Sequence, residues 1–150
     1  MAYEARAVIT NLAKQYTADM WAYGTSFQVM YFQISAGGHD PTDPTTALAP
    51  DPAATTMPGT VLFGPEVIDS VTWESIMCPK FNCVIEQGEY VGELSSVALV
   101  AKIVYDPARP AGAPASPGLG TEFLFALYNR PRLILTSTDG PTTFSLMPFF

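Results

Sequence analysis

The chain has 150 residues, of which 48% are apolar and only 14% are charged, with 7 Lys and Arg against 14 Asp and Glu and a formal net charge of -7. This composition excludes disorder driven by low hydrophobicity and high charge, and the excess of acids excludes nucleic-acid binding through a basic face. Because a soluble domain usually carries about 25–35% charged residues on its surface, the charge deficit predicts a surface that is wetted by Ser, Thr and Pro or covered by neighbouring subunits.

The amino-terminal segment is predicted to be helical. Its apolar residues recur every three or four positions from Tyr3 to Tyr16, which indicates an amphipathic helix over residues 3–16. The character of the chain then changes. Residues 21–24 predict a turn, and the aromatic and β-branched residues 26–34 alternate in part, which is typical of a strand.

Two proline-rich stretches interrupt the chain, at about residues 36–59 and 107–120. Neither a helix nor a central strand tolerates such a density of proline. Both stretches are longer than the roughly 12–15 residues beyond which structureless loops become uncommon in compact domains. We therefore expect extended loops, and we interpret them as arms that pack against neighbouring subunits, with two surface loops on a monomer as the alternative.

The rest of the chain reads as short strands separated by turn signals. Together with one helix, this pattern predicts a single mainly β domain over residues 1–150, an antiparallel β-sandwich with an N-terminal α-helix and two long Pro-rich loops. The strands are predicted at residues 61–63, 67–73, 81–85, 90–94, 97–105, 122–128, 133–136 and 143–147.

No segment indicates a membrane partner or a secretory signal. The longest apolar stretch, residues 97–105, includes Lys102 and is far shorter than the roughly 20 residues of a membrane span. The first six residues contain no apolar run typical of a signal peptide. Cys78 and Cys83 allow either a bridge across a short loop or two thiols.

Candidate catalytic and metal-binding groups are sparse. The only histidine, His39, could join Asp40, Asp43 and Asp51 in a loose oxygen-rich cation site, but a solvated turn in which Asp accepts from backbone N–H groups explains the same residues better. The two cysteines lack the second pair that a zinc site needs.

Further catalytic patterns are also missing. The acids Glu86, Glu89 and Glu93 flank glycines at a turn and therefore do not predict a catalytic acid pair. No G-x-S-x-G motif or phosphate-binding glycine loop is present in the sequence. The sequence therefore predicts no enzyme, no cofactor and no metal site.

Several stretches resemble structural proteins of tailed bacteriophages. Residues 90–99 resemble a strand near the start of tail-collar and tail-fibre attachment proteins, and residues 122–128, 130–136 and 143–150 follow in the order of that family. Residues 32–41 look like the strand end and Pro-rich loop of baseplate and tail-fibre adaptor proteins. The chain departs from the pattern at Ala98, where the family has Gly, and at Leu135, where the family has Lys.

The resemblance implies a virion structural protein of the tail, baseplate or collar, made in the host cytoplasm, which joins the tail to fibres or neighbouring rings by protein–protein packing. Its partners would be copies of itself, in a homo-oligomer, and other tail or fibre proteins. One alternative is a capsid decoration or head-completion protein. A second is a small carbohydrate-binding β-sandwich, in which Trp21, Tyr23, Tyr31 and Trp73 could offer stacking platforms although core positions suit them better.

The contact surface expected from this interpretation comprises the two Pro-rich loops, the exposed side of the helix at residues 3–16 and the aromatic C-terminus. An exposed pair of Phe residues would act as an association patch. The predicted interface residues are His39, Asp40, Pro41, Asp43, Pro44, Pro50, Pro52, Pro58, Pro110, Pro114, Pro117, Phe149 and Phe150.

Overall fold

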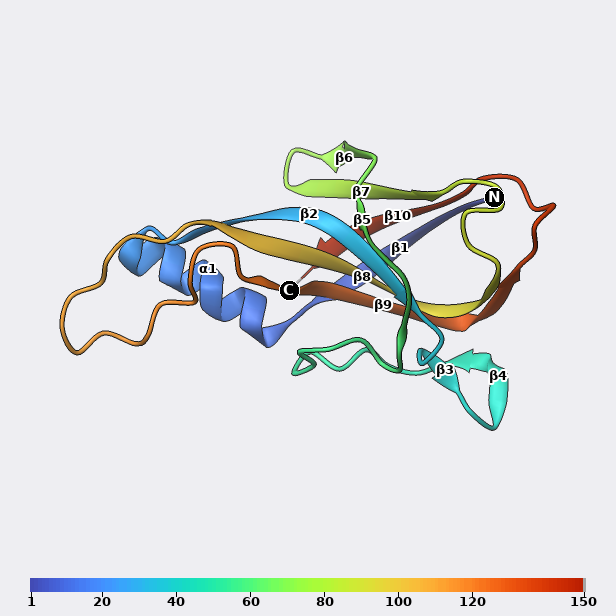
Figure 1. Ribbon diagram of the computed structural model, residues 1–150, viewed down its shortest axis with the longest axis horizontal. Coiled ribbons are helices and arrows are strands. Elements are labelled where there is room, and N and C mark those ends of the chain that lie inside the picture. Colours follow the sequence, from blue (N-terminus) through green and yellow to red (C-terminus); the bar gives the residue numbers. More distant parts are fainter. Residues whose placement is uncertain (150) are drawn as a thin grey trace.

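The computed structural model describes residues 1–149, and within them the protein is mainly β, with ten strands and one helix (Figure 1). In chain order the elements are β1 (Ala2–Ile9), α1 (Asn11–Tyr23), β2 (Ser26–Ser35), β3 (His39–Asp40), β4 (Asp43–Ala47), β5 (Val61–Val67), β6 (Ser70–Ser75), β7 (Cys78–Ile85), β8 (Gly92–Tyr105), β9 (Glu122–Leu135) and β10 (Thr142–Phe149).

Eight strands form one mixed sheet in the order β5-β2-β8-β9-β1-β10-β7-β6, and β3 and β4 form a separate pair. The mainly β class is therefore confirmed, but the predicted sandwich of two sheets is not. The prediction of an antiparallel sheet is wrong for one pair, because the first and last strands of the described chain, β1 and β10, run parallel. Hydrogen bonds fasten their starts together, from the Met1 ammonium to the Pro141 carbonyl at 2.8 Å and from Thr143 N to the Met1 carbonyl at 2.9 Å.

The sheet curls because β5 and β6 follow each other directly in the chain yet pair with β2 and β7, at opposite ends of the strand order. The two residues between them hydrogen-bond to both partners. Ile68 N donates to the Met30 carbonyl of β2 at 3.0 Å, and Asp69 N donates to the Asn82 carbonyl of β7 at 3.0 Å. The two ends of the sheet are thus drawn together around one main core.

Both faces of β8 are buried, which explains its continuous apolar run. Successive residues of a strand point to opposite faces, so Val97 and Leu99 face the main core while Ala98 and Val100 belong to a second, smaller cluster. Met57, from the segment between β4 and β5, completes this second cluster and is only 6% exposed.

The predicted helix over residues 3–16 is wrong in its first half, because residues 2–9 form β1. Within β1 the outward residues Glu4 and Arg6 are exposed and alternate with better-buried ones that end in Ala7 and Ile9, which is the two-residue period of a strand. Apolar residues at short spacing fit both periods, and pairing with β10 over seven consecutive residues decides in favour of the strand.

The helix α1 begins after Thr10 and therefore lies further toward the C-terminus than the predicted helix over residues 3–16. The Thr10 hydroxyl oxygen accepts a hydrogen bond from Ala13 N at 3.2 Å, which caps the first turn. Gly24, with φ 79°, ends the helix in the left-handed conformation, and its N–H donates to the Met20 carbonyl. Residues 21–23, predicted as a turn, are therefore the last turn of α1.

The two Pro-rich stretches differ from each other. The first, residues 36–59, contains the β3–β4 hairpin and is otherwise without helix or strand. The second lies between β8 and β9, and residues 106–121 carry neither helix nor strand.

Candidate interaction surface

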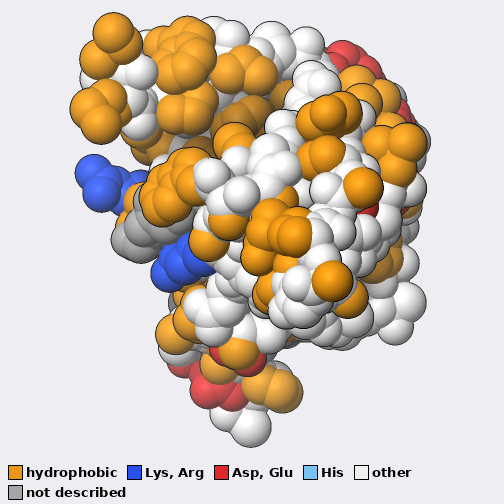
Figure 2. All heavy atoms as spheres, turned by 90° about the vertical axis from the view of Figure 1, so that its left-hand side faces the viewer, with side chains coloured by type: hydrophobic (Ala, Val, Ile, Leu, Met, Phe, Trp, Pro, Cys, Tyr) orange, Lys and Arg blue, Asp and Glu red, His pale blue; other side chains and the backbone are white. Residues whose placement is uncertain are grey.

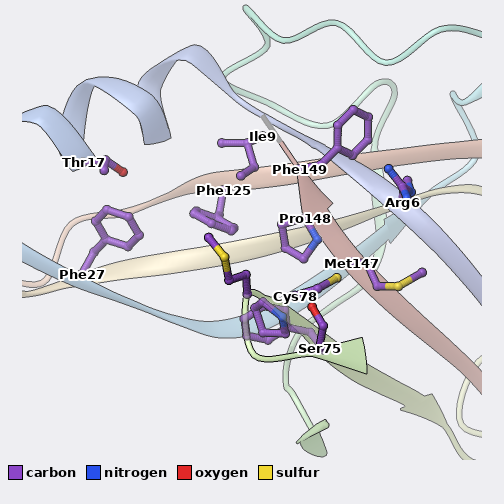
Figure 3. A pocket seen from close by; sticks show the side chains of 13 residues that line it. Arg6, Ile9, Thr17, Phe27, Ser75, Cys78, Phe125, Met147, Pro148 and Phe149 are labelled. Atoms are coloured by element: carbon purple, nitrogen blue, oxygen red, sulfur yellow. The ribbon is translucent and has the colours of Figure 1, made fainter. Parts of the chain in front are cut away.

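A cavity of about 580 Å³ opens at the end of the curled sheet that carries α1. Figure 3 shows side chains from several elements lying around it, with Phe27 of β2 and Phe125 of β9 on one side and residues of the β6–β7 hairpin and the end of β10 on the other. Its lining is mostly apolar. Arg6 is the charged residue at its edge, and the Arg6 guanidinium lies 5.9 Å from the centre of the Phe149 ring. We call this cavity the apolar groove.

The β6–β7 hairpin beside the groove has a polar face on which the side chains satisfy one another. The Asn82 amide donates to the Ser70 hydroxyl at 3.0 Å and to the Thr72 hydroxyl at 3.2 Å, while its oxygen accepts from the Ser145 hydroxyl at 2.7 Å. This face therefore offers few unpaired polar groups to a partner.

Charges on the hairpin are also paired. Lys80 contacts Glu4 at 2.8 Å and Glu74 at 2.9 Å, and hydrogen bonds to these two carboxylates raise the pKa of Lys80 above its usual value. The hairpin is thus close to electrically neutral although the chain as a whole is acidic.

The opposite face and the tip of the hairpin are apolar and exposed. Val71 lies opposite Phe81 and Trp73 opposite Pro79, so these side chains share the face that borders the groove. Val71 is 46% and Trp73 63% exposed, and at the tip Ile76 is 92% and Met77 89% exposed. Figure 2 shows hydrophobic side chains gathered at this corner, at the upper left.

The first predicted contact segment is fixed to the sheet by His39. Ser95 is fully buried, and its hydroxyl accepts from Gly38 N at 2.8 Å and lies 2.8 Å from His39 Nδ1. Since the hydroxyl already accepts one bond, it can donate its own hydrogen to the imidazole. This Ser–His pair positions β3 against the core, and its buried serine leaves a substrate no access to Oγ.

The acids of the β3–β4 hairpin stabilise its turn. The Asp40 carboxylate accepts from Thr42 N at 2.9 Å, and the Asp43 carboxylate accepts from the Thr45 hydroxyl at 2.6 Å. Hydrogen bonds from Thr42 lower the pKa of Asp40, and those from Thr45 and Thr46 lower that of Asp43. Among residues 1–149 no group of three or more His, Cys, Asp or Glu side chains converges to hold a metal ion.

The rest of the first Pro-rich stretch covers the sheet. Asn11 N donates to the Pro52 carbonyl at 2.7 Å, and the Ser35 hydroxyl donates to the Pro58 carbonyl. With Met57 buried against β8 and β9, this segment closes the second core cluster. Pro52 therefore lies in a covering segment that contributes to the fold, although its own side chain is exposed. Pro41 is also exposed, whereas Pro44 and Pro50 are half-buried.

The second Pro-rich stretch is held against α1 by Arg109. One guanidinium nitrogen donates to the Asp19 carboxylate at 3.1 Å and to the Thr25 hydroxyl at 3.0 Å, and the group lies 4.6 Å from the centre of the Tyr23 ring. The side chains of Arg109 and Asp19 are only 5% and 13% exposed.

Asp106 holds the same stretch at its two ends. Its carboxylate accepts from the Thr25 hydroxyl at 3.2 Å and from Gly118 N at 2.9 Å. Hydrogen bonds from Ser116 first, and then from Gly118 and Thr25, lower the pKa of Asp106. Within this anchored loop Pro110 and Pro114 are exposed, and Pro117 is half-buried.

The predicted interface residues do not form one surface. Figure 1 shows the β3–β4 hairpin and the loop after β8 at opposite ends of the molecule. Phe149, 39% exposed, lines the apolar groove, whereas Phe150 lies outside the described residues. The exposed side of a helix at residues 3–16 does not exist, because residues 2–9 are a strand.

The four aromatic residues considered for carbohydrate stacking have different environments. Trp21 on α1 is 83% exposed and Trp73 on β6 is 63% exposed, so the expectation of core positions is wrong for both. Tyr31 packs against the second core cluster, and Arg109 stacks on Tyr23.

Cys78 and Cys83 are free thiols. Both belong to β7, and five residues of extended strand place their Cα atoms about 16 Å apart, whereas a disulfide needs about 4.4–6.8 Å. The alternative of a bridge is therefore wrong for this fold. Among residues 1–149, the helix is not long and apolar enough to cross a membrane.

Sequence reasoning missed the exposed hairpin, although one signal pointed to it. Hairpin turns are usually built from Gly, Asn, Asp, Ser or Pro, and here Ile76 and Met77 occupy the tip. Two large apolar residues at this turn indicate a turn that does not need to contact water.

Comparison of the chain with protein-family models, with curated proteins and with solved structures finds no match.

Proposed function

We propose that this protein is a structural component of a tailed-phage virion, in the tail, baseplate or collar, and that it acts by packing against other subunits. The observation that carries this proposal is the apolar β6–β7 tip beside the apolar groove, where Ile76 and Met77 are about nine-tenths exposed. Apolar area of this kind on a sparsely charged surface is typical of a protein–protein contact. The sequence resemblance supports the virion as the place where such contacts are made.

Particles produced from the genome that carries this gene provide the test. The protein should band with purified tailed particles, and antibody labelling in electron micrographs should fall on the tail. Labelling on the head would favour the decoration or head-completion alternative, and absence from purified particles would rule out both.

A matched pair of variants tests the surface itself. Ile76→Ser with Met77→Ser should leave a folded protein that is incorporated into particles poorly, because both side chains are exposed and contribute little to the core. The control is Val91→Ser, which removes a side chain that is 55% exposed and lies outside the predicted contact segments. Equal incorporation of the two variants would contradict a role for the hairpin.

A further inference from the structure

The eight-stranded sheet ends in two edge strands, β5 and β6, and they differ in how their free edges are protected. An edge strand presents a row of unpaired backbone N–H and C=O groups, and proteins block such edges with proline or with charged side chains. β5 contains Pro65, which has no N–H, and the exposed Glu66. β6 contains no proline, and its one charge, Glu74, is engaged by Lys80 at 2.9 Å.

All six residues of β6 are exposed, so no other part of the described chain covers its free edge. Its two faces have opposite character, with Val71 and Trp73 on one and Ser70, Thr72 and Glu74 on the other. A partner strand at this edge would therefore need an apolar face beside Val71 and Trp73 and a polar face without free charge.

We propose that the partner is β6 of a second copy of this chain, paired antiparallel about a twofold axis that lies midway between the two copies of Thr72. Such an axis, perpendicular to the sheet, preserves the two faces of the strand and places Val71 of one copy opposite Trp73 of the other. The apolar residues then form one four-residue cluster across the junction, and Ser70 faces Glu74 of the other copy.

The same register gives neighbours to the two most exposed large apolar side chains of the described residues, Ile76 and Met77. Continuing the pairing beyond β6 brings the tip of one hairpin, Ile76 and Met77, alongside the β5–β6 corner of the other copy. Val67, which is 68% exposed, lies at that corner. With Val71 and Trp73, five of the large exposed apolar residues of each copy are therefore covered by one interface.

The charges near β6 permit this contact although each copy carries a net charge of -7. Lys80 engages the Glu74 carboxylate, and the Asp69 carboxylate at the start of the strand accepts a hydrogen bond from Val84 N at 2.7 Å. The isolated protein would form this dimer with or without a virion, so the two proposals can fail separately.

Sedimentation velocity over a range of protein concentrations tests the dimer. The wild-type protein should pass from monomer to dimer as the concentration rises. Thr72→Lys places two ammonium groups opposite each other across the axis and should raise the dissociation constant about tenfold or more, because like charges directly opposite in a sheet repel. Thr60→Lys adds the same charge at an exposed position outside the strand and is the matched control.

Mixing Thr72→Lys with Thr72→Glu tests the register, because the two side chains attract each other only when position 72 faces position 72. The mixture should form a heterodimer at protein concentrations at which each variant alone stays monomeric. A wild-type protein that stays monomeric, equal effects of Thr72→Lys and Thr60→Lys, or a mixture that stays monomeric would each overturn the proposal. Amide hydrogen exchange tests the wild-type protein without a variant. If the β6 amides do not exchange more slowly at high protein concentration, the proposal is overturned too.

Discussion

The loop after β8 is anchored by Arg109 together with Asp106, and replacing Arg109 should destabilise the whole domain. Arg109 and Asp19 are 5% and 13% exposed, so Arg109→Met leaves the Asp19 carboxylate largely buried without its partner. It also leaves the fully buried Thr25 hydroxyl with one partner fewer. Breaking a buried ion pair on one side costs about 3–5 kcal/mol.

We expect the lower end of that range, about 3 kcal/mol, because Asp19 retains some access to water. For a domain of this size such a loss lowers the midpoint of thermal unfolding by roughly 6–12 °C. The assay is urea unfolding of the wild-type and variant proteins, monitored by circular dichroism and by tryptophan fluorescence.

Lys14→Met is the matched control, since it removes one exposed positive charge from the same helix. Its free energy of unfolding should change by less than about 0.5 kcal/mol. If Arg109→Met were as stable as Lys14→Met, the loop would be held by Asp106 and its own turns, and the ion pair would contribute nothing. A deletion of residues 110–117 should likewise destabilise the domain, since the Pro114 and Ala115 carbonyls accept from Arg109.

Three further outcomes are expected. Met57→Ala should lower the free energy of unfolding, measured in urea, by about 2–3 kcal/mol, because it opens a cavity in the second core cluster. Met77→Ala, at an 89% exposed position, should change this free energy little. Equal losses would refute the role of Met57 in covering the sheet. In the folded protein a thiol reagent should modify Cys78 well before Cys83, because burial raises the pKa of the Cys83 thiol, and equal rates would contradict that burial. Hydrogen bonds lower the pKa of Asp106 in the folded state, so its contribution to stability is present above the ordinary pKa of 3.8 and is lost as the pH falls through the lowered pKa. Asp106→Asn should therefore make the free energy of unfolding fall less steeply with decreasing pH in the acid range. An unchanged pH dependence would refute this.

The strands that sequence reasoning placed well are those with a strong local signal. Residues 26–34, 97–105 and 122–128 all lie in β2, β8 and β9. Their β-branched and aromatic content, or their continuous apolar run, leaves little room for a helix.

The errors arise where a local pattern is compatible with two structures. The spacing of Ala5 and Ile9 satisfies both a helix and a strand, and the choice is made by hydrogen bonds to β10, more than 130 residues away in the sequence. The single curled sheet likewise depends on bonds from Ile68 and Asp69 to strands that no local pattern connects.

The surface was harder to predict than the fold, because proline density does not distinguish a free arm from a tethered segment. Arg109 and Met57, which hold the two Pro-rich stretches in place, carry no signal in their own neighbourhood. Their roles appear only when distant helices and strands are brought against them.

β10 is an interior strand of the sheet, although it follows the other strands of the sheet in the chain, and this limits how the sheet can form during synthesis. β10 lies between β1, which precedes the other strands of the sheet in the chain, and β7, so the sheet has no continuous path from one end to the other until residues 142–149 have been synthesised. Contacts between residues so far apart in the sequence form slowly, and the unpaired edges of β1 and β7 can pair with wrong partners in the meantime. During synthesis, the edges of β1 and β7 that β10 covers in the folded protein therefore stay unpaired until residues 142–149 can pair with both strands.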